Sequence, residues 1–187
     1  MPVKVEQAAT PAQRATEDDL RATPKDGQKY ELVDGQIVVS PAGNLQEVVS
    51  VRLAALLLAF VDQHNLGNIL GSSAGFRLPG GNVRSPDVSF VAKGRYEQDI
   101  VPEDWPDLAP DLAVEVLSPH DRPRVILDKV GEYLQAGVRM VWVIDAKASR
   151  AVVYRSLTDA HTVEGAGSLD GEDVLPGFRC GLAEILK

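Results

Sequence analysis

The chain has 187 residues, of which 44% are hydrophobic and 25% are charged, and its net charge is −8. This size and composition are those of one globular domain with a substantial core, and no apolar run approaches the ~20 residues of a membrane helix. The acidic balance disfavours a broad phosphate-binding surface, because nucleic-acid binding depends largely on Lys and Arg. A local basic groove, or contact with phosphate through a metal ion, remains compatible with it.

The single cysteine, Cys180, excludes an internal disulfide and a cysteine-cluster zinc site, and it is typical of a reducing cytosol. Residues 1–20 have no apolar signal core, so we expect a cytoplasmic protein that does not act at a membrane. Residues 1–15 are rich in Ala, Pro, Gln and Thr without periodicity. We therefore expect a flexible tail over 1–15 and one domain over 16–187.

The first half of the domain contains two helical patterns and a hairpin. Thr16 followed by three acidic residues predicts a short capped helix over 17–22. The string "KYELVDGQIVVS" predicts a β-hairpin around Asp34-Gly35. Residues 46–64 carry an apolar stripe about five turns long, which predicts a helix that is mostly buried.

The second half predicts more strands. The strings "GNILGSSAGFRL" and "VRSPDVSFVAK" are typical of two strands joined by a turn at 79–82, and the proline-rich residues 94–110 predict a loop. Residues 112–117 are almost continuously apolar, which predicts a central strand covered on both faces. A helix over 124–136 capped by Gly137, a hairpin around "AKAS" and a last short strand with a helical turn follow. The fold class is α/β, with a mixed, bent sheet flanked by helices.

Two carboxylates and one lysine stand out in this pattern. Asp87 opens a strand directly after Pro86, Glu115 lies inside the apolar strand, and Lys129 lies on the helix that follows. Neighbouring strands are ~4.8 Å apart, so acids on two of them can face one cation. Mg²⁺ is typically held by one or two carboxylates, water and phosphate oxygens. A nearby lysine can orient or deprotonate water, or stabilise charge on phosphate.

Each residue also has a simpler interpretation. Asp87 could be a turn or strand-start residue, and Glu115 could form a buried ion pair with Arg84 or Arg124. Lys129 could be a solvated lysine paired with Asp128 or Glu132, and Glu31 could point outward from its strand. Ser118 and His120 could suggest a serine hydrolase, but the G-x-S-x-G turn of such enzymes is missing.

The order of several motifs resembles a known family. The strings "YELVDGQIVVSP", "SPDVSFV", "PDLAVEVLSPHDR", "DKVGEYLQAGVRMVWVIDAKASRAVVYR" and "LPGFRCGLAEIL" are similar to the Uma-type endonuclease family. That family belongs to the restriction-endonuclease-like, PD-(D/E)xK superfamily, and the resemblance covers residues 16–187. It implies a restriction-endonuclease-like fold and Mg²⁺- or Mn²⁺-dependent hydrolysis of phosphodiester bonds, with DNA as the expected partner. It also implies a homodimer by analogy.

The resemblance assigns roles to individual positions. Asp87 and Glu115 match the metal-binding acids, and Glu31 matches a further acid at the metal. Leu117 stands where the superfamily usually has its lysine, so Lys129 on the following helix would take that role. The supporting residues are Tyr133, one helical turn past Lys129, and Gln46, which stands where many relatives carry histidine.

Two alternatives stay open at this point. The departure at Gln46 and the net charge of −8 also suit a catalytically weak or inactive nuclease-fold protein that serves as a binding or assembly module. The substrate could also be RNA or branched DNA.

Overall fold

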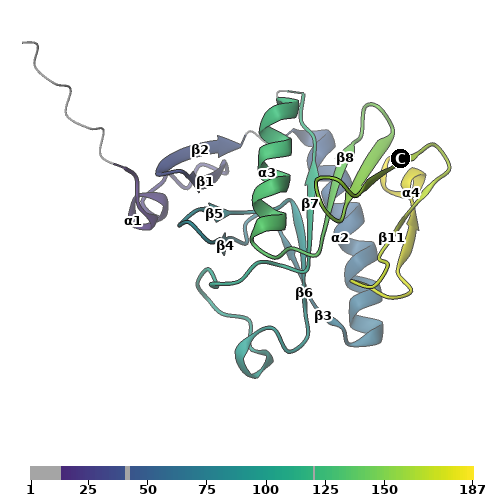
Figure 1. Cartoon of the computed structure of the whole chain (residues 1–187), viewed down its shortest axis with the longest axis horizontal. Helices are drawn as coiled ribbons and strands as arrows, with labels where there is room; N and C mark the ends of the chain where they lie inside the picture. The colour runs from purple at the N-terminus through teal and green to yellow at the C-terminus, as the bar shows by residue number, and fades with distance from the viewer. Residues whose placement is uncertain (1–13, 41–42, 120) are drawn as a thin grey trace, which may run out of the picture.

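A computed structural model describes residues 14–40, 43–119 and 121–187 (Figure 1). Residues 1–13 of the expected tail lie outside the described residues, as does His120. The helices are α1 (Glu17–Arg21), α2 (Asn44–His64), η1 (Glu97–Asp99), α3 (Pro123–Gln135) and α4 (Leu182–Ile185). The strands are β1 (Lys29–Val33), β2 (Gln36–Ser40), β3 (Gly67–Gly71), β4 (Phe76–Arg77), β5 (Val83–Arg84), β6 (Val88–Ala92), β7 (Leu112–Val116), β8 (Met140–Asp145), β9 (Arg150–Tyr154), β10 (Ala160–Glu164), β11 (Ser168–Asp170) and β12 (Arg179–Gly181).

The central sheet has six strands in the order β10-β9-β8-β7-β6-β3. Strands β7 and β8 run parallel, and the other neighbours in this sheet are antiparallel. The expectation of a mixed α/β sheet is therefore confirmed. All five residues of β7 are buried, as the continuous apolar run predicted for a central strand.

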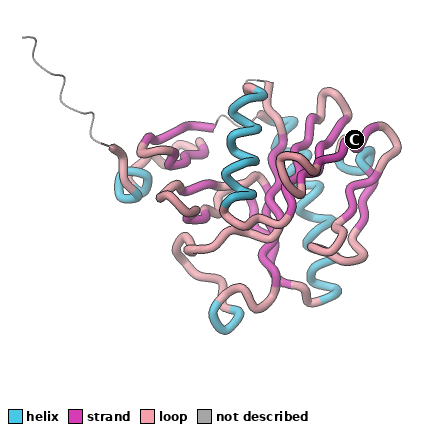
Figure 2. The backbone as a smooth tube through the Cα atoms, viewed as in Figure 1, coloured by secondary structure: helices cyan, strands magenta, loops and turns pink. Residues whose placement is uncertain are grey.

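Both faces of this sheet are covered (Figures 1 and 2). Helix α2 and the C-terminal segment pack on one face, and helix α3 packs on the other. The core on the first face includes Leu53, Leu57, Phe90, Trp142, Leu175 and Leu182. The core on the second face includes Phe76, Val91, Ala113, Val130, Tyr133 and Val141. Because side chains alternate along a strand, Ala113 and Glu115 share the face that α3 covers.

The two long strands expected around residues 67–93 are each broken in two. Strands β3 and β6 pair in the central sheet, whereas β4 and β5 pair with each other in a second sheet of order β2-β1-β5-β4. The breaks fall in the small-residue run 72–75 and at 85–87, where Pro86 has no N–H to donate to a strand ladder. The chain therefore passes from one sheet to the other just before β6, and Asp87 lies at this passage.

Helix α2 is much more exposed than we expected. By its length and its mean hydropathy of 1.6 alone it could cross a membrane. In the fold, one stripe consisting of Val49, Leu53, Leu57 and Val61 is buried against the sheet. Only one face of α2 meets the sheet, so Leu45, Val48, Val51 and Leu58 remain exposed. The helix is therefore a core helix with an open outer face.

Other expectations hold within one or two residues. The hairpins β1–β2 and β8–β9 form at the expected turns, and η1 interrupts the expected loop. Helix α3 ends at Gln135 with Ala136 as its C-cap, and Gly137 follows with a left-handed φ of 97° that favours glycine. Strands β10 and β11 were not foreseen, because their short polar sequences carry no strand pattern.

Candidate active site

Strand β7 carries Glu115 into the interior between two neighbouring strands. Antiparallel β6 lies on one side, with Val88 opposite Val114, and parallel β8 lies on the other, with Val143 opposite Glu115. The side chain of Glu115 is only 5% exposed. Its backbone is fixed on both sides, so its carboxylate has little freedom to move away from the site.

Asp87 is placed opposite Glu115 by backbone pairing that begins one residue before β6. The Asp87 N–H donates to the carbonyl of Val114 at 2.9 Å, and the Val116 N–H donates to Asp87 Oδ2 at 2.8 Å. Asp87 is 5% exposed. Asp87 does stand at the start of a strand, as the simpler interpretation held, but its side chain is buried opposite Glu115 and is not that of an exposed turn residue.

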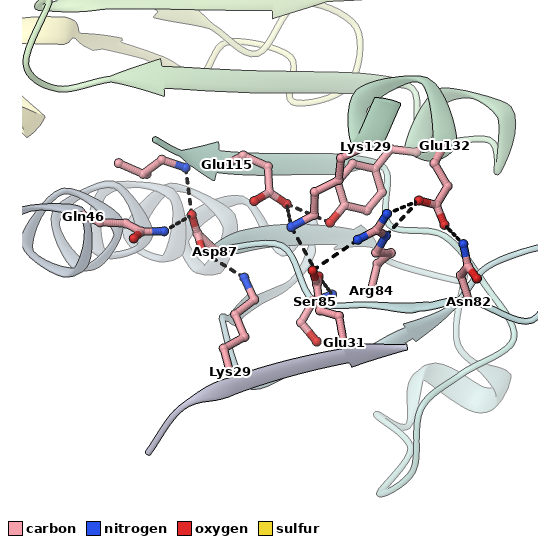
Figure 3. A network of polar contacts seen from close by, with 12 residues as sticks. Lys29, Glu31, Gln46, Asn82, Arg84, Ser85, Asp87, Glu115, Lys129 and Glu132 are labelled. Carbon is pink, nitrogen blue, oxygen red and sulfur yellow. Dashed lines mark hydrogen bonds and ion pairs between the residues drawn. The ribbon is translucent and has the colours of Figure 1, made fainter. Parts of the chain in front are cut away.

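Helix α3 turns Lys129 toward Glu115 (Figure 3). Tyr133, one turn further along the helix, reaches the same carboxylate. Lys129 Nζ lies 2.9 Å from Glu115 Oε1 and 3.2 Å from Glu31 Oε1. The Tyr133 hydroxyl donates to Glu115 Oε1 at 2.8 Å. Leu117, at the usual lysine position, packs instead against the α3 side of the core. A lysine supplied by the helix thus does reach the acid, and Lys129 is not a solvated residue.

Glu31 is 2% exposed, so the alternative of an outward side chain is wrong. Its Oε1 accepts the Ser85 N–H at 2.8 Å as well as contacting Lys129, and its Oε2 lies 3.3 Å from Arg84. Arg84 also pairs with Glu132 of α3 at 2.6 Å. Arg84 thus forms ion pairs with Glu31 and Glu132, and not with Glu115. Its pair with Glu132 links β5 to α3.

Glu31, Asp87 and Glu115 form an acidic cluster. Burial and charge act in opposite directions on the pKa values of Glu31, Glu115 and Lys129. Burial raises the pKa of Glu115, and the ammonium groups of Lys129 and Lys29 oppose this only in part. Burial also raises the pKa of Glu31, but Lys129, Lys29 and Arg84 outweigh it and the net direction is downward. Burial lowers the pKa of Lys129, but the nearby carboxylates of Glu115 and Glu31 raise it by a larger amount. The net direction is upward, so the ammonium stays protonated and donates hydrogen bonds.

Two further side chains hold Asp87. Gln46, in the first turn of α2, donates to Asp87 Oδ2 at 2.9 Å, and Lys29 Nζ lies 2.9 Å from Asp87 Oδ1 (Figure 3). Gln46 was expected near the site, but Lys29 was not predicted. Arg84 and Glu132 were considered only as partners of Glu115 and Lys129, whereas Arg84 pairs with Glu31 and Glu132. The alternation along β1 could have indicated Lys29, since it lies two residues before Glu31 and so faces the same side.

A cleft leads to this cluster from the surface. Its volume is 570 Å³, and its lining includes Lys29, Gln46 and Asp87. A second hollow of 580 Å³ also reaches Asp87 from the side of α2. Glu115 and Lys129 do not line either hollow. Asp87 is therefore the point at which the buried cluster meets the outside.

The donors in this cluster suit a hard cation. Asp87 and Glu115 present oxygen ligands from adjacent strands, and no described residue donates a hydrogen bond to Glu115 Oε2. Both oxygens of Glu31 meet protein donors, and so do both oxygens of Asp87, where Oδ1 lies against Lys29 and Oδ2 accepts from Gln46 and Val116. Within residues 14–40, 43–119 and 121–187, no three His, Cys, Asp or Glu side chains are grouped to hold one metal ion. The cluster thus fits a cation bound by two carboxylates and completed by water or phosphate.

The chain also matches known proteins. The profile of the Uma2 family, described as "Putative restriction endonuclease", matches residues 17–183. The chain belongs to the Uma2 family. None of the curated proteins compared with this Uma2 chain matches it.

A crystal structure from Anabaena variabilis, described as "a putative nuclease belonging to DUF820", superposes on the Uma2 chain with a TM-score of 0.79. The two are 17% identical, and the match covers 91% of this chain and 97% of the other. At this identity the likeness shows a shared fold. The expected α/β, restriction-endonuclease-like fold is confirmed.

Proposed function

We propose that the protein is a metal-dependent endonuclease that hydrolyses phosphodiester bonds in DNA. The observation that carries this proposal is the convergence of three elements on one point. Asp87, directly before β6, stands opposite Glu115 of β7, and Lys129 of α3 lies 2.9 Å from Glu115. An acid pair with a lysine is the donor set that phosphodiester hydrolysis needs, because charge develops on the phosphate and on the attacking water.

Each residue has a distinct part in the proposed reaction. Asp87 and Glu115 would hold Mg²⁺ or Mn²⁺, and Glu31 would assist them by fixing Lys129. The bound cation would supply Lewis-acid activation of water and neutralise charge on the phosphate. Lys129, as a protonated donor, would orient the attacking water or stabilise the pentavalent phosphate. Tyr133 would keep Glu115 oriented through its hydrogen bond.

The cleft supports a nucleic-acid substrate in spite of the net charge of −8. Arg21, Lys25 and Lys29 all line it. A phosphate backbone approaching Asp87 would therefore meet a local group of cations, although the chain as a whole is acidic. Affinity that depends on these few contacts should fall with added salt.

Nicking of supercoiled plasmid is the direct test. The wild-type chain should nick in Mg²⁺ or Mn²⁺ and stop when EDTA removes the metal, and Glu115→Gln should lose the activity with little change in shape. Glu164→Gln, an exposed acid on β10, is the matched control and should nick like wild type. Nicking that survives in Glu115→Gln would come from a contaminant and would refute the proposal.

One observation favours a second candidate, a nuclease-fold protein that binds without cutting. Gln46 occupies the place on Asp87 where the resemblance led us to expect histidine, and an amide cannot take up a proton from water. Such a module would bind labelled DNA or RNA in a salt-sensitive way and would show no nicking in either metal. Comparing DNA, RNA and branched DNA in the same binding and cleavage assays separates these possibilities.

We also propose that the protein acts as a homodimer. A two-fold dimer presents two sites in opposite directions, which matches the two antiparallel strands of a DNA duplex. Sedimentation equilibrium with and without a short duplex tests this. A chain that stays monomeric in both cases would contradict it.

A further inference from the structure

Lys29 is a second lysine at the site, and the motifs that indicated the acids and Lys129 did not predict it. It opens β1 two residues before Glu31, so both side chains project from the same face of the strand toward β6 (Figure 3). Its ammonium lies 2.9 Å from Asp87 Oδ1, its side chain is only 14% exposed, and it also lines the 570 Å³ cleft. Lys29 thus stands between the cleft and the acids.

The other cations of the site are already engaged elsewhere. Lys129 contacts Glu115 and Glu31, and Arg84 contacts Glu31 and Glu132. In the described part of the chain, Lys29 is the one cation within ion-pair distance of Asp87, which otherwise has only amide donors. A carboxylate this deeply buried needs a counter-charge. Lys29 provides at Asp87 the charge that a divalent cation would provide.

A divalent cation on Asp87 would compete with the Lys29 ammonium, because Lys29 contacts Oδ1 and Oδ2 already accepts hydrogen bonds from Gln46 and Val116. The flexible four-carbon stem of lysine lets its charge move, and the cleft offers space on the side of Lys29. Lys129 has no such route, because it is 7% exposed and lines neither hollow.

We infer that Lys29 is an exchangeable counter-ion, which a divalent cation displaces from Asp87 into the cleft, where its ammonium can contact a substrate phosphate. This inference rests on the proposed function, because it assumes that Asp87 and Glu115 hold the metal. Binding of a divalent cation to Asp87 and Glu115 would then have a second effect. It would free the Lys29 ammonium to contact phosphate at the entrance of the cleft.

Calorimetric titration of the full chain with Mn²⁺ tests the exchange. Lys29→Met should bind Mn²⁺ about tenfold more tightly than wild type, as expected if the ammonium holds the site about nine-tenths of the time. Lys25→Met makes the same charge change at the exposed wall of the cleft and should stay within about twofold of wild type. Glu115→Gln should lose binding, which tests the metal site independently of Lys29.

Lysine acetylation followed by mass spectrometry gives a second measurement on the wild-type chain, which needs no folded Lys29 variant. Labelling of Lys29 should rise several-fold on addition of Mn²⁺, while Lys25 stays constant, and Glu115→Gln should abolish the rise.

The outcomes separate the two proposals. Binding in Lys29→Met but not in wild type would support the exchange in its strongest form. If Lys29→Met binds Mn²⁺ no more tightly than wild type, or if Mn²⁺ does not change the labelling of Lys29, the exchange is refuted. The proposed metal site is not affected by either result. Absence of binding in both chains, or binding that survives in Glu115→Gln, would overturn the metal site and the exchange together.

Discussion

The hydroxyl of Tyr133 donates a hydrogen bond of 2.8 Å to Glu115 Oε1, and both side chains are buried. Burial raises the pKa of Tyr133 well above its ordinary value, so the phenol keeps its proton and its role as donor. Tyr133→Phe removes the donor from a buried acceptor, which should lower the free energy of unfolding by about 1–3 kcal/mol. Urea denaturation followed by circular dichroism measures this loss.

Tyr30→Phe is the matched control for that substitution. Its hydroxyl donates to Asp26 at 2.9 Å in an exposed setting, where water can replace the lost partner. We expect a change within about 0.5 kcal/mol. Equal effects of the two substitutions would show that Glu115 does not depend on Tyr133.

Lys129 is the shared counter-charge of Glu115 and Glu31. Lys129→Met leaves Glu115 buried without the cation that contacts it, and we expect about 3–5 kcal/mol of destabilisation. Adding Glu115→Gln to that variant removes the stranded charge, so the double variant should be more stable than Lys129→Met alone. Thermal melts of the three chains measure this order. Lys147→Met, at an exposed lysine, should melt like wild type.

Much of this site could be predicted because its residues contradict their local pattern. An acid inside the continuously apolar strand β7 has to be paired or bound, which made Glu115 visible in the sequence. Helical spacing then placed Lys129 and Tyr133 on one face of α3. Hydrophobic periodicity likewise predicted the central strand and the long helices almost to the residue.

The remaining parts depend on contacts between distant segments, which no local pattern records. Arg84 lies 48 residues from Glu132, and Lys29 lies 58 residues from Asp87. The breaks at 72–75 and 85–87 were not predicted, because the residues before and after each break both have a strand-like sequence. Each pair of strands therefore looks like one longer strand in the sequence. These breaks are what bring the sheet of β1 and β5 beside β6, and with it Lys29 and Arg84.

Gln46 offers a test of how Asp87 is held. It donates to Asp87 Oδ2 at 2.9 Å, and Gln46→His would place an imidazole beside this carboxylate. The pKa of that imidazole should rise above its ordinary value of about 6.5 in the folded chain. Its stabilising effect is then fully present below about pH 6.5 and is lost as the pH rises through the raised value.

Melting temperatures across this pH range measure that effect. The variant should gain stability relative to wild type at about pH 6 and lose the gain at about pH 8. Gln36→His, at an exposed position of β2, should show no such dependence. A flat difference for Gln46→His would mean that the imidazole does not contact Asp87.

Cys180 can report on the integrity of the fold, because it is the single cysteine in the chain and is 3% exposed. Burial, with a smaller effect of Glu184, raises the pKa of its thiol from 9.0 to about 12. The raised pKa contributes stability that is fully present below pH 9.0 and is lost as the pH rises through about 12. At about pH 8 the folded chain should therefore react very slowly with iodoacetamide, because the thiolate is the nucleophile.

Mass spectrometry of the alkylated chain checks this prediction. Labelling of Cys180 should be complete within minutes in concentrated urea. In buffer the rate of labelling should be set by global unfolding, because Cys180 packs in the core with α2 and the C-terminal segment. Tyr133→Phe and Lys129→Met should then label faster in proportion to their lost stability. If Cys180 were labelled rapidly in buffer, at a rate that neither urea nor these substitutions change, the end of β12 would open locally. That result would contradict the core position of Cys180.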